Sequence, residues 1–309
     1  MRITDAIRRR MVANTTSLFS HAEYPLARTL DHRGDPGLFG PDSATWPVIG
    51  DVAAFFGGIR ALLVQAAHPE VSAGVADHSR YREDPLGRLS RTSAYVTATS
   101  FGAKPEVDAA VEVVKRAHRR VTGVSHRGNS YTADAPPLAA WVHNALTDSF
   151  LTAYQRFARQ PLSQSDADRF VSEQAKVGAL LYSDPLPGTA RDLSAWIAQH
   201  PHLGPSPGTE DAIKFLRSPP LPWNVKPAYR LLFWAASATL PRRLRRILGL
   251  RRIPGAITVG KIASRGLRWA LGSSPSWQIA LVRTGAPIPP GLFHQRLAPE
   301  VQAMVDSGE

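Results

Sequence analysis

An apolar helix near the middle of the chain constrains the fold most strongly. Pro136 or Pro137 suits the first turn of a helix that continues to residue 157. Its apolar side chains fall on nearly all sides, which predicts a central helix that other elements must surround. His143 lies in this helix and is a candidate buried histidine, either hydrogen-bonded in the core or serving as a ligand.

Other apolar helices are predicted around this one. Residues 51–67 carry apolar side chains at helical spacing, and Pro69 should end this helix near His68. Four further segments also follow a helical pattern, at residues 69–81, 164–183, 192–201 and 228–240. Turns rich in proline and glycine separate them, and we find no repeat period, phosphate-binding loop or nucleophile elbow. The sequence therefore predicts an all-α protein.

The composition excludes several kinds of chemistry. The chain of 309 residues contains no Cys, which rules out disulfides, thiolate metal sites and cysteine nucleophiles. Histidines, carboxylates and hydroxyls remain for any reaction. Because no apolar run reaches the length of a secretory signal or a transmembrane helix, we expect a cytoplasmic protein.

The net charge of +12 comes from the C-terminal part of the chain. Fifteen Lys or Arg and no Asp or Glu lie between residues 212 and 299, with the highest density at residues 241–252. There, four apolar residues form an edge beside four arginines: Leu240, Leu244, Ile247 and Leu248 beside Arg242, Arg243, Arg245 and Arg246. This pattern predicts peripheral contact with an anionic membrane through residues 226–268, and a solvated basic face is the alternative. Nucleic acid is less favoured, because no aromatic platform and no helix-turn-helix pattern accompany the charge.

Residues 103–123 predict a helix with one histidine in its apolar stripe. Val107, Val111 and Val114 recur at helical spacing, and His118 should face the same way. An imidazole in that position is either a core histidine satisfied by one hydrogen bond or a ligand to a bound group. The spacing alone favours the core histidine.

A polar stripe is predicted on residues 86–102. If this segment is a helix, Arg88, Thr92, Tyr95 and Thr99 share one face. The stripe has a single charge, so a lined cavity or an anion site is as well supported as a solvent face. The β-branched and aromatic content also permits a strand, and we predict a helix.

Six phrases of the sequence resemble one known family: GGIRALLVQAAHP, GVADHSRY, DPLGRLSRT, AHRRVTG, YTADAP and WVHNALTDSF. Together, over residues 42–283, they are similar to MpaB-type oxygenases and latex clearing protein, a rubber oxygenase. The resemblance implies a single large helical domain with a globin-like core that holds haem b through a histidine. It leaves residues 1–41 as an N-terminal helix and wrapping arm, and residues 284–309 as a tail.

The resemblance also implies roles for individual residues. The proximal ligand of the haem iron corresponds to His118, and the distal arginine and threonine correspond to Arg88 and Thr92. Latex clearing protein has a distal lysine ligand where this chain has Arg91. Since a guanidinium stays protonated, we expect an open distal site or another sixth ligand.

The family pattern gives further residues less definite roles. Arg91 and Arg60 are candidates for binding the haem propionates, and His143 is an alternative ligand or a neighbour of the haem site. His78 is expected to cap a helix or to form a hydrogen bond.

The predicted function is that of a haem b-dependent oxygenase acting with dioxygen on a small apolar lipid or isoprenoid. Latex clearing protein is exported to reach its polymer, whereas this chain shows no signal, so rubber is not the expected substrate. Two alternatives remain from other classes of protein. One is a helical haem or lipid carrier without turnover, and the other is a structural protein of the membrane surface.

Overall fold

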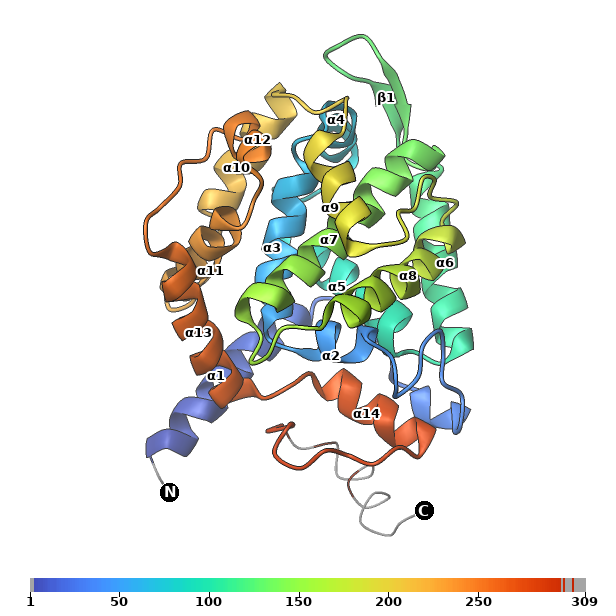
Figure 1. Cartoon of the computed structure of the whole chain (residues 1–309), viewed down its shortest axis with the longest axis vertical. Coiled ribbons are helices and arrows are strands. Elements are labelled where there is room, and N and C mark those ends of the chain that lie inside the picture. The colour runs from blue at the N-terminus through green and yellow to red at the C-terminus, as the bar shows by residue number, and fades with distance from the viewer. Residues whose placement is uncertain (1–2, 296, 298–301, 303–309) are drawn as a thin grey trace. The chain divides into compact units, whose positions relative to one another are not determined.

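The computed structural model describes residues 3–295, 297 and 302. In this part of the chain there are fourteen α-helices, one short 3-10 helix and one two-stranded hairpin, so the prediction of a mainly helical protein is confirmed (Figure 1). Contacts divide the chain into two compact units. Unit 1 comprises Met1–Val52, Leu86–Glu112 and Arg265–Glu309, and unit 2 comprises Ala53–Pro85 and Val113–Ser264. None of the described helices is both long and apolar enough to cross a membrane.

Unit 2 is built around the predicted central helix, α7 (Pro136–Phe157), in which thirteen side chains are buried. Its neighbours are α3 (Ala53–Gln65), α8 (Gln164–Leu180) and α9 (Ala190–Gln199). The other helices that lie wholly in this unit are α4 (Pro69–His78), α10 (Pro207–Arg217), α11 (Lys226–Ala238) and α12 (Arg242–Ile247). The rings of Phe56 and Phe157 stack with centroids 4.3 Å apart, which places α3 directly against the end of α7.

Glycine allows α3 and α7 to approach closely. A Cβ atom on Gly57 would lie 2.7 Å from the ring of Phe150, whereas one on the adjacent Gly58 would meet nothing within 4 Å. The absence of a side chain at Gly57 therefore sets the spacing of the two helices.

Unit 1 contains α1 (Ile3–Phe19), η1 (Thr29–His32), α2 (Thr45–Gly50), most of α5 (Pro85–Phe101) and α14 (Pro275–Thr284). The side chain of Arg283 on α14 is fully buried. Its Nη1 donates to Thr29 Oγ1 and to the Phe101 carbonyl, each at 2.6 Å, and its Nε donates to the Asp35 carbonyl at 2.8 Å. One guanidinium thus joins the N-terminal arm, the end of α5 and α14.

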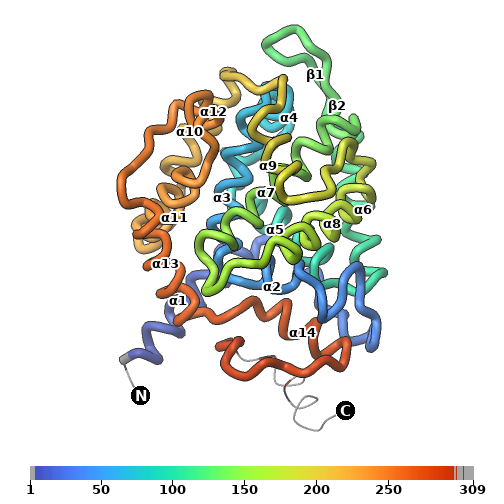
Figure 2. The backbone as a smooth tube through the Cα atoms, viewed as in Figure 1, coloured from blue at the N-terminus to red at the C-terminus, as the bar shows by residue number. Residues whose placement is uncertain are grey.

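The helix predicted for residues 103–123 ends early. Helix α6 covers Lys104–His118, and the chain then turns into β1 (Thr122–Val124), which pairs antiparallel with β2 (Ser130–Thr132). Tyr131 donates to Asp77 Oδ2 at 2.6 Å and packs near Gly74, so α4 holds the hairpin. Figure 2 shows the hairpin near α4. Where the last turn of the helix was predicted, the chain instead pairs with β2 and is held by this contact with α4. The chain that follows α6 is therefore a hairpin.

The apolar edge predicted to lie on a bilayer is buried instead. Leu240, Leu244 and Leu248 are at most 4% exposed, so this edge of α12 packs into the protein. Two of the neighbouring arginines are also engaged, because Arg243 donates to the Ala198 carbonyl and Arg245 to the Leu240 carbonyl. The helix is anchored by leucines and arginines together, which corrects the expectation of a membrane-facing leucine edge.

Three helices were not among those predicted from the sequence pattern. These are α10, α13 (Ala256–Leu271) and α14. Helix α14 ends at Thr284, where the predicted tail begins, and part of that tail lies outside the described residues. The proposed domain limits and the globin-like core stay predictions.

Candidate functional site

His118 is the last residue of α6 and lies half-buried at the end of its apolar stripe. Val107 and Val111 on the same helix are buried, while Val113 is 56% exposed, so the predicted inward face is present and narrow. The backbone N–H of Val121 donates to the His118 carbonyl at 2.9 Å, which fixes the chain where the helix ends. The histidine therefore sits at the boundary of helix and hairpin rather than in mid-helix.

The ring nitrogens of His118 are available to bind a ligand. Burial lowers its pKa, and the nearby Asp134 carboxylate opposes that shift. No described residue is a hydrogen-bond partner for this ring. A neutral imidazole with an available nitrogen is the form that binds a metal or haem iron.

His143 has a different environment, enclosed between α7 and α8. Burial lowers its pKa to about 4, although a hydrogen bond with the Gln174 backbone acts in the opposite direction. Thr147 Oγ1 lies 3.4 Å from His143 Nε2, and a Cβ atom on Gly178 would lie 2.7 Å from the ring. This packing is that of a hydrogen-bonded core histidine.

The predicted polar stripe is carried by α5, which confirms the helix over the strand. Thr92 Oγ1 donates to the Arg88 carbonyl at 3.0 Å, and Thr99 Oγ1 donates to the Tyr95 carbonyl at 2.9 Å. Both threonines therefore bond within their own helix and retain lone pairs as acceptors. Arg88 is half-buried and Arg91 is exposed.

Tyr95 is the unusual member of this stripe. Its hydroxyl is buried and has no hydrogen-bond partner among the described residues. Burial raises the pKa of Tyr95, so the phenol stays protonated and can donate. The Tyr95 phenol is therefore a buried donor for which the described residues supply no acceptor.

Arg60 is part of an internal ion pair in unit 2. Its Nη1 lies 2.7 Å from Asp148 Oδ2 and donates to Ser149 Oγ at 2.8 Å. Both charged side chains are nearly inaccessible. The contact joins α3 to α7 and gives Arg60 a packing role that the sequence did not reveal.

A second group of polar residues was missed by the sequence pattern. His68 Nδ1 lies 3.2 Å from Glu70 Oε2, and Glu70 Oε1 accepts from Ser125 and Asn129, each at 3.1 Å. Burial lowers the pKa of His68 to about 4. These residues tie the start of α4 to the turn of the hairpin, and only the pairing of that hairpin brings them together.

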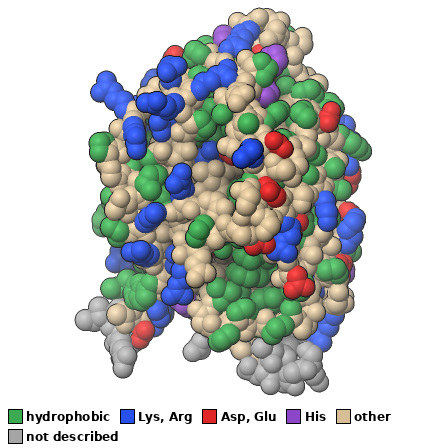
Figure 3. Space-filling view, viewed as in Figure 1, with side chains coloured by type: hydrophobic (Ala, Val, Ile, Leu, Met, Phe, Trp, Pro, Cys, Tyr) green, Lys and Arg blue, Asp and Glu red, His purple; other side chains and the backbone are tan. Residues whose placement is uncertain are grey.

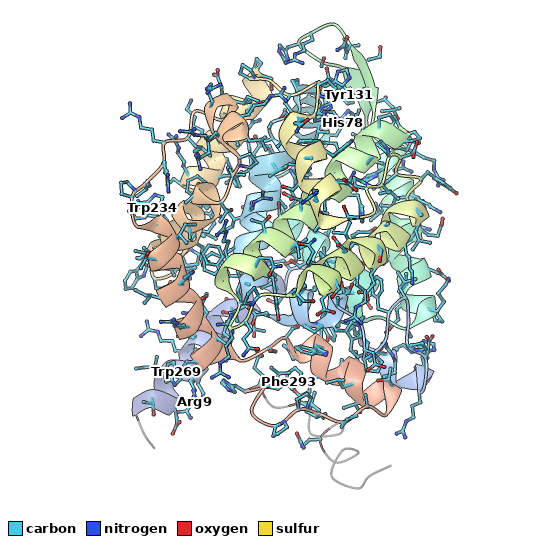
Figure 4. All side chains as sticks on the ribbon, viewed as in Figure 1. Arg9, His78, Tyr131, Trp234, Trp269 and Phe293 are labelled. Atoms are coloured by element: carbon cyan, nitrogen blue, oxygen red, sulfur yellow. The ribbon has the colours of Figure 1, made fainter. Side chains whose placement is uncertain are left out.

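The structure places His78 in a hydrogen bond and divides the other candidate residues between the two units. His78 bonds through Nε2 to the Thr122 carbonyl at 2.9 Å, which confirms its predicted hydrogen bond, and it lies beside Tyr131 in Figure 4. For the other candidates, His118, His143 and Arg60 lie in unit 2, and Arg88, Arg91 and Thr92 lie in unit 1. Helix α7 carries both His143 and the partner of Arg60.

Among the described residues, no three His, Cys, Asp or Glu side chains form a metal-binding group.

Comparison with known families gives one match. The family model for the catalytic domain of "ER-bound oxygenase mpaB/B'/Rubber oxygenase" matches residues 46–271, most of the chain. Searches among curated proteins and among solved structures found no match. The matched range begins at the first residues of α2 and includes every candidate residue named above. The chain therefore belongs to the family of mpaB-type oxygenases and rubber oxygenases.

Proposed function

We propose that this protein is a haem b-dependent oxygenase that uses dioxygen to oxidise a small lipid or isoprenoid carrying an alkene. Membership of the oxygenase family supports the reaction class. The observation that carries the assignment of the cofactor is the half-buried His118 ring, which has no hydrogen-bond partner among the described residues and a lowered pKa.

The surroundings of His118 fit an axial ligand of haem. His118 would hold the iron through one ring nitrogen, and its position at the end of an anchored helix gives the ring a rigid mount. Asp134, which already interacts with this ring, would orient it from the other side. Bound haem supplies an iron centre that activates dioxygen. His143 serves the packing of α7 and α8 instead, since its ring is enclosed by protein.

Residues of α5 would act on the distal side. Arg88 would hold negative charge on oxygen, and Thr92 would orient the oxygen through its hydroxyl. Tyr95 joins them in this proposal, because its buried hydroxyl is a donor that needs an acceptor. Arg91 is exposed and is our choice for a propionate, since the Arg60 side chain is nearly inaccessible.

Absorption spectroscopy tests the cofactor and its ligand. The purified protein, oxidised and dithionite-reduced, is compared with His118→Ala and His143→Ala variants after reconstitution with haem. We expect a strong haem band in the parent, loss of that band in His118→Ala, and its retention in any His143→Ala protein that remains folded by circular dichroism. A parent that binds no haem when haem is supplied would contradict the proposal.

Oxygen uptake tests the reaction itself. The reduced, haem-loaded protein is given farnesol or squalene in an oxygen electrode, and products are identified by mass spectrometry. We expect uptake that depends on substrate and falls in Arg88→Gln and Thr92→Val. Bound haem without uptake for any alkene would instead identify a haem carrier.

A further inference from the structure

A hollow of about 580 Å³ opens on unit 2 beside α11. Its wall includes three arginines and three large apolar side chains, namely Arg217, Arg230, Arg251, Phe233, Trp234 and Ile253. We call it the α11 hollow. None of the candidate haem residues contributes to it, so it is a separate site.

The arginines give the α11 hollow uncompensated positive charge. Arg230 and Arg251 are exposed, and no described carboxylate pairs with either of them. Arg217 donates to the Gly249 carbonyl at 3.2 Å, which holds the loop after α12 against α10. No Asp or Glu occurs between residues 212 and 299, so the local sequence cannot neutralise these guanidiniums. Convergent guanidiniums of this kind suit a phosphate or another oxyanion.

Apolar side chains are exposed around the same site. Trp234 is 42% exposed and Ile253 is 40% exposed, and Figure 4 shows Trp234 at the outer edge of α11. Helix α13 packs on α11 where a Cβ atom on Gly260 would lie 2.6 Å from Ala235 Cβ, and Ile262 on α13 is 62% exposed. In Figure 3, Lys and Arg side chains gather where Figure 1 shows α11 and α12. Basic residues interleaved with exposed Trp and Ile are typical of a surface that enters a lipid interface.

We propose that the α11 hollow binds the phosphate headgroup of an anionic lipid and thereby docks this face onto an anionic bilayer. Arg230 and Arg251 would pair with the phosphate, while Trp234 and Ile253 would enter the acyl boundary. Nucleic acid is the weaker fit, because a charged phosphate backbone offers no apolar surface against which the exposed aliphatic side chains could be buried. The proposal does not rest on haem or on oxygenase activity.

Vesicle sedimentation with the full chain tests the site. The probes are vesicles of phosphatidylcholine alone and of phosphatidylcholine with one third phosphatidylglycerol, at physiological salt. The variants are R230Q/R251Q, W234A, and the control K176Q/R191Q, which removes the same charge from exposed positions on α8 and α9. Each cation near an anionic membrane contributes about 1 kcal/mol, so R230Q/R251Q should weaken partition roughly 30-fold. The control should weaken it less than about threefold, since its charges lie outside the hollow.

The outcomes separate this site from general charge attraction. Parent binding to the anionic vesicles only, with a large loss in R230Q/R251Q, a smaller loss in W234A and little change in the control, supports the proposal. Equal losses in R230Q/R251Q and the control would overturn it, as would failure of the parent to bind. Binding to duplex DNA with the same arginine dependence, and none to vesicles, would identify a nucleic-acid surface instead. Circular dichroism checks that each variant is folded.

Discussion

The guanidinium of Arg60 and the carboxylate of Asp148 lie 2.7 Å apart, and both side chains are nearly inaccessible to solvent. Removing one member of such a pair leaves a buried charge without compensation. We expect Asp148→Asn to reduce the free energy of unfolding by about 3–5 kcal/mol. Urea denaturation at pH 7 measures the change.

The double variant R60M/D148L is the matched control for this pair. Replacing both charges by apolar side chains of similar size removes the cost of the unpaired charge, so we expect it to lose less than half as much stability as Asp148→Asn. A double variant that is as unstable as the single one would show that the ion pair itself, rather than the isolated charge, accounts for the loss.

Two adjacent glycines on α3 should respond in opposite directions to alanine. At Gly57 the new methyl group would meet Phe150 at 2.7 Å, so we expect G57A to lose about 1–3 kcal/mol through overpacking. At Gly58 nothing lies within 4 Å, so G58A should gain up to about 1 kcal/mol from helix propensity. Thermal and urea unfolding of the two variants, side by side, make the comparison. Equal changes in the free energy of unfolding would mean that helix propensity alone determines the effect of alanine at both positions.

The hydroxyl of Tyr95 should be removable without loss of stability. Because this buried donor lacks a partner, Tyr95→Phe should leave the free energy of unfolding of the haem-free protein unchanged or raise it by about 1 kcal/mol. In the haem-loaded protein, the same change should reduce oxygen uptake if the phenol donates to a bound group. A marked drop in the stability of the haem-free variant would reveal a partner for the hydroxyl within the protein.

Stability should depend on pH through His143. Burial lowers its pKa to about 4, against an ordinary value of about 6.5 in the unfolded chain. Between these values the unfolded chain binds a proton that the native protein does not, so stability is complete above pH 6.5 and decreases as the pH falls toward 4. One such group contributes a slope of up to about 1.4 kcal/mol per pH unit.

Urea denaturation at pH 7, 6 and 5 gives this slope. His143→Gln cannot take up the proton, so its stability should decrease less steeply over the same range, even though the variant is less stable at pH 7. Parallel curves for the two proteins would show that His143 does not account for the pH dependence.

Local signals were sufficient to predict much of the helical structure. Pro136 marks the first turn of α7, as its position before an apolar run indicated. In the structure, Ser163 caps α8 by accepting from the Asp166 N–H at 3.1 Å. The hairpin was not predicted, because its strands have three residues each and depend on contacts with α4. Helix α10 was not predicted either, although Ser206 and Pro207 form an ordinary start signal.

The candidate site was predictable only in part. Periodicity placed His118 and His143 on buried faces, but it could not distinguish a ring with available nitrogens from a ring enclosed by Gly178 and Thr147. That difference depends on which neighbours the tertiary fold supplies. The pairing of Arg60 with Asp148 is likewise a contact between distant segments, and neither segment alone carries a signal for it.

The buried Arg283 affects the order in which the chain can fold during its synthesis. Its hydrogen bond to Thr29 spans 254 residues, and its bond to the Phe101 carbonyl spans 182 residues. Domains are commonly completed as the chain emerges from the ribosome. Every segment of unit 2 has been made by residue 264, whereas unit 1 lacks its central guanidinium until α14 has been synthesised. The N-terminal arm is therefore held by Arg283 only after α14 has been synthesised.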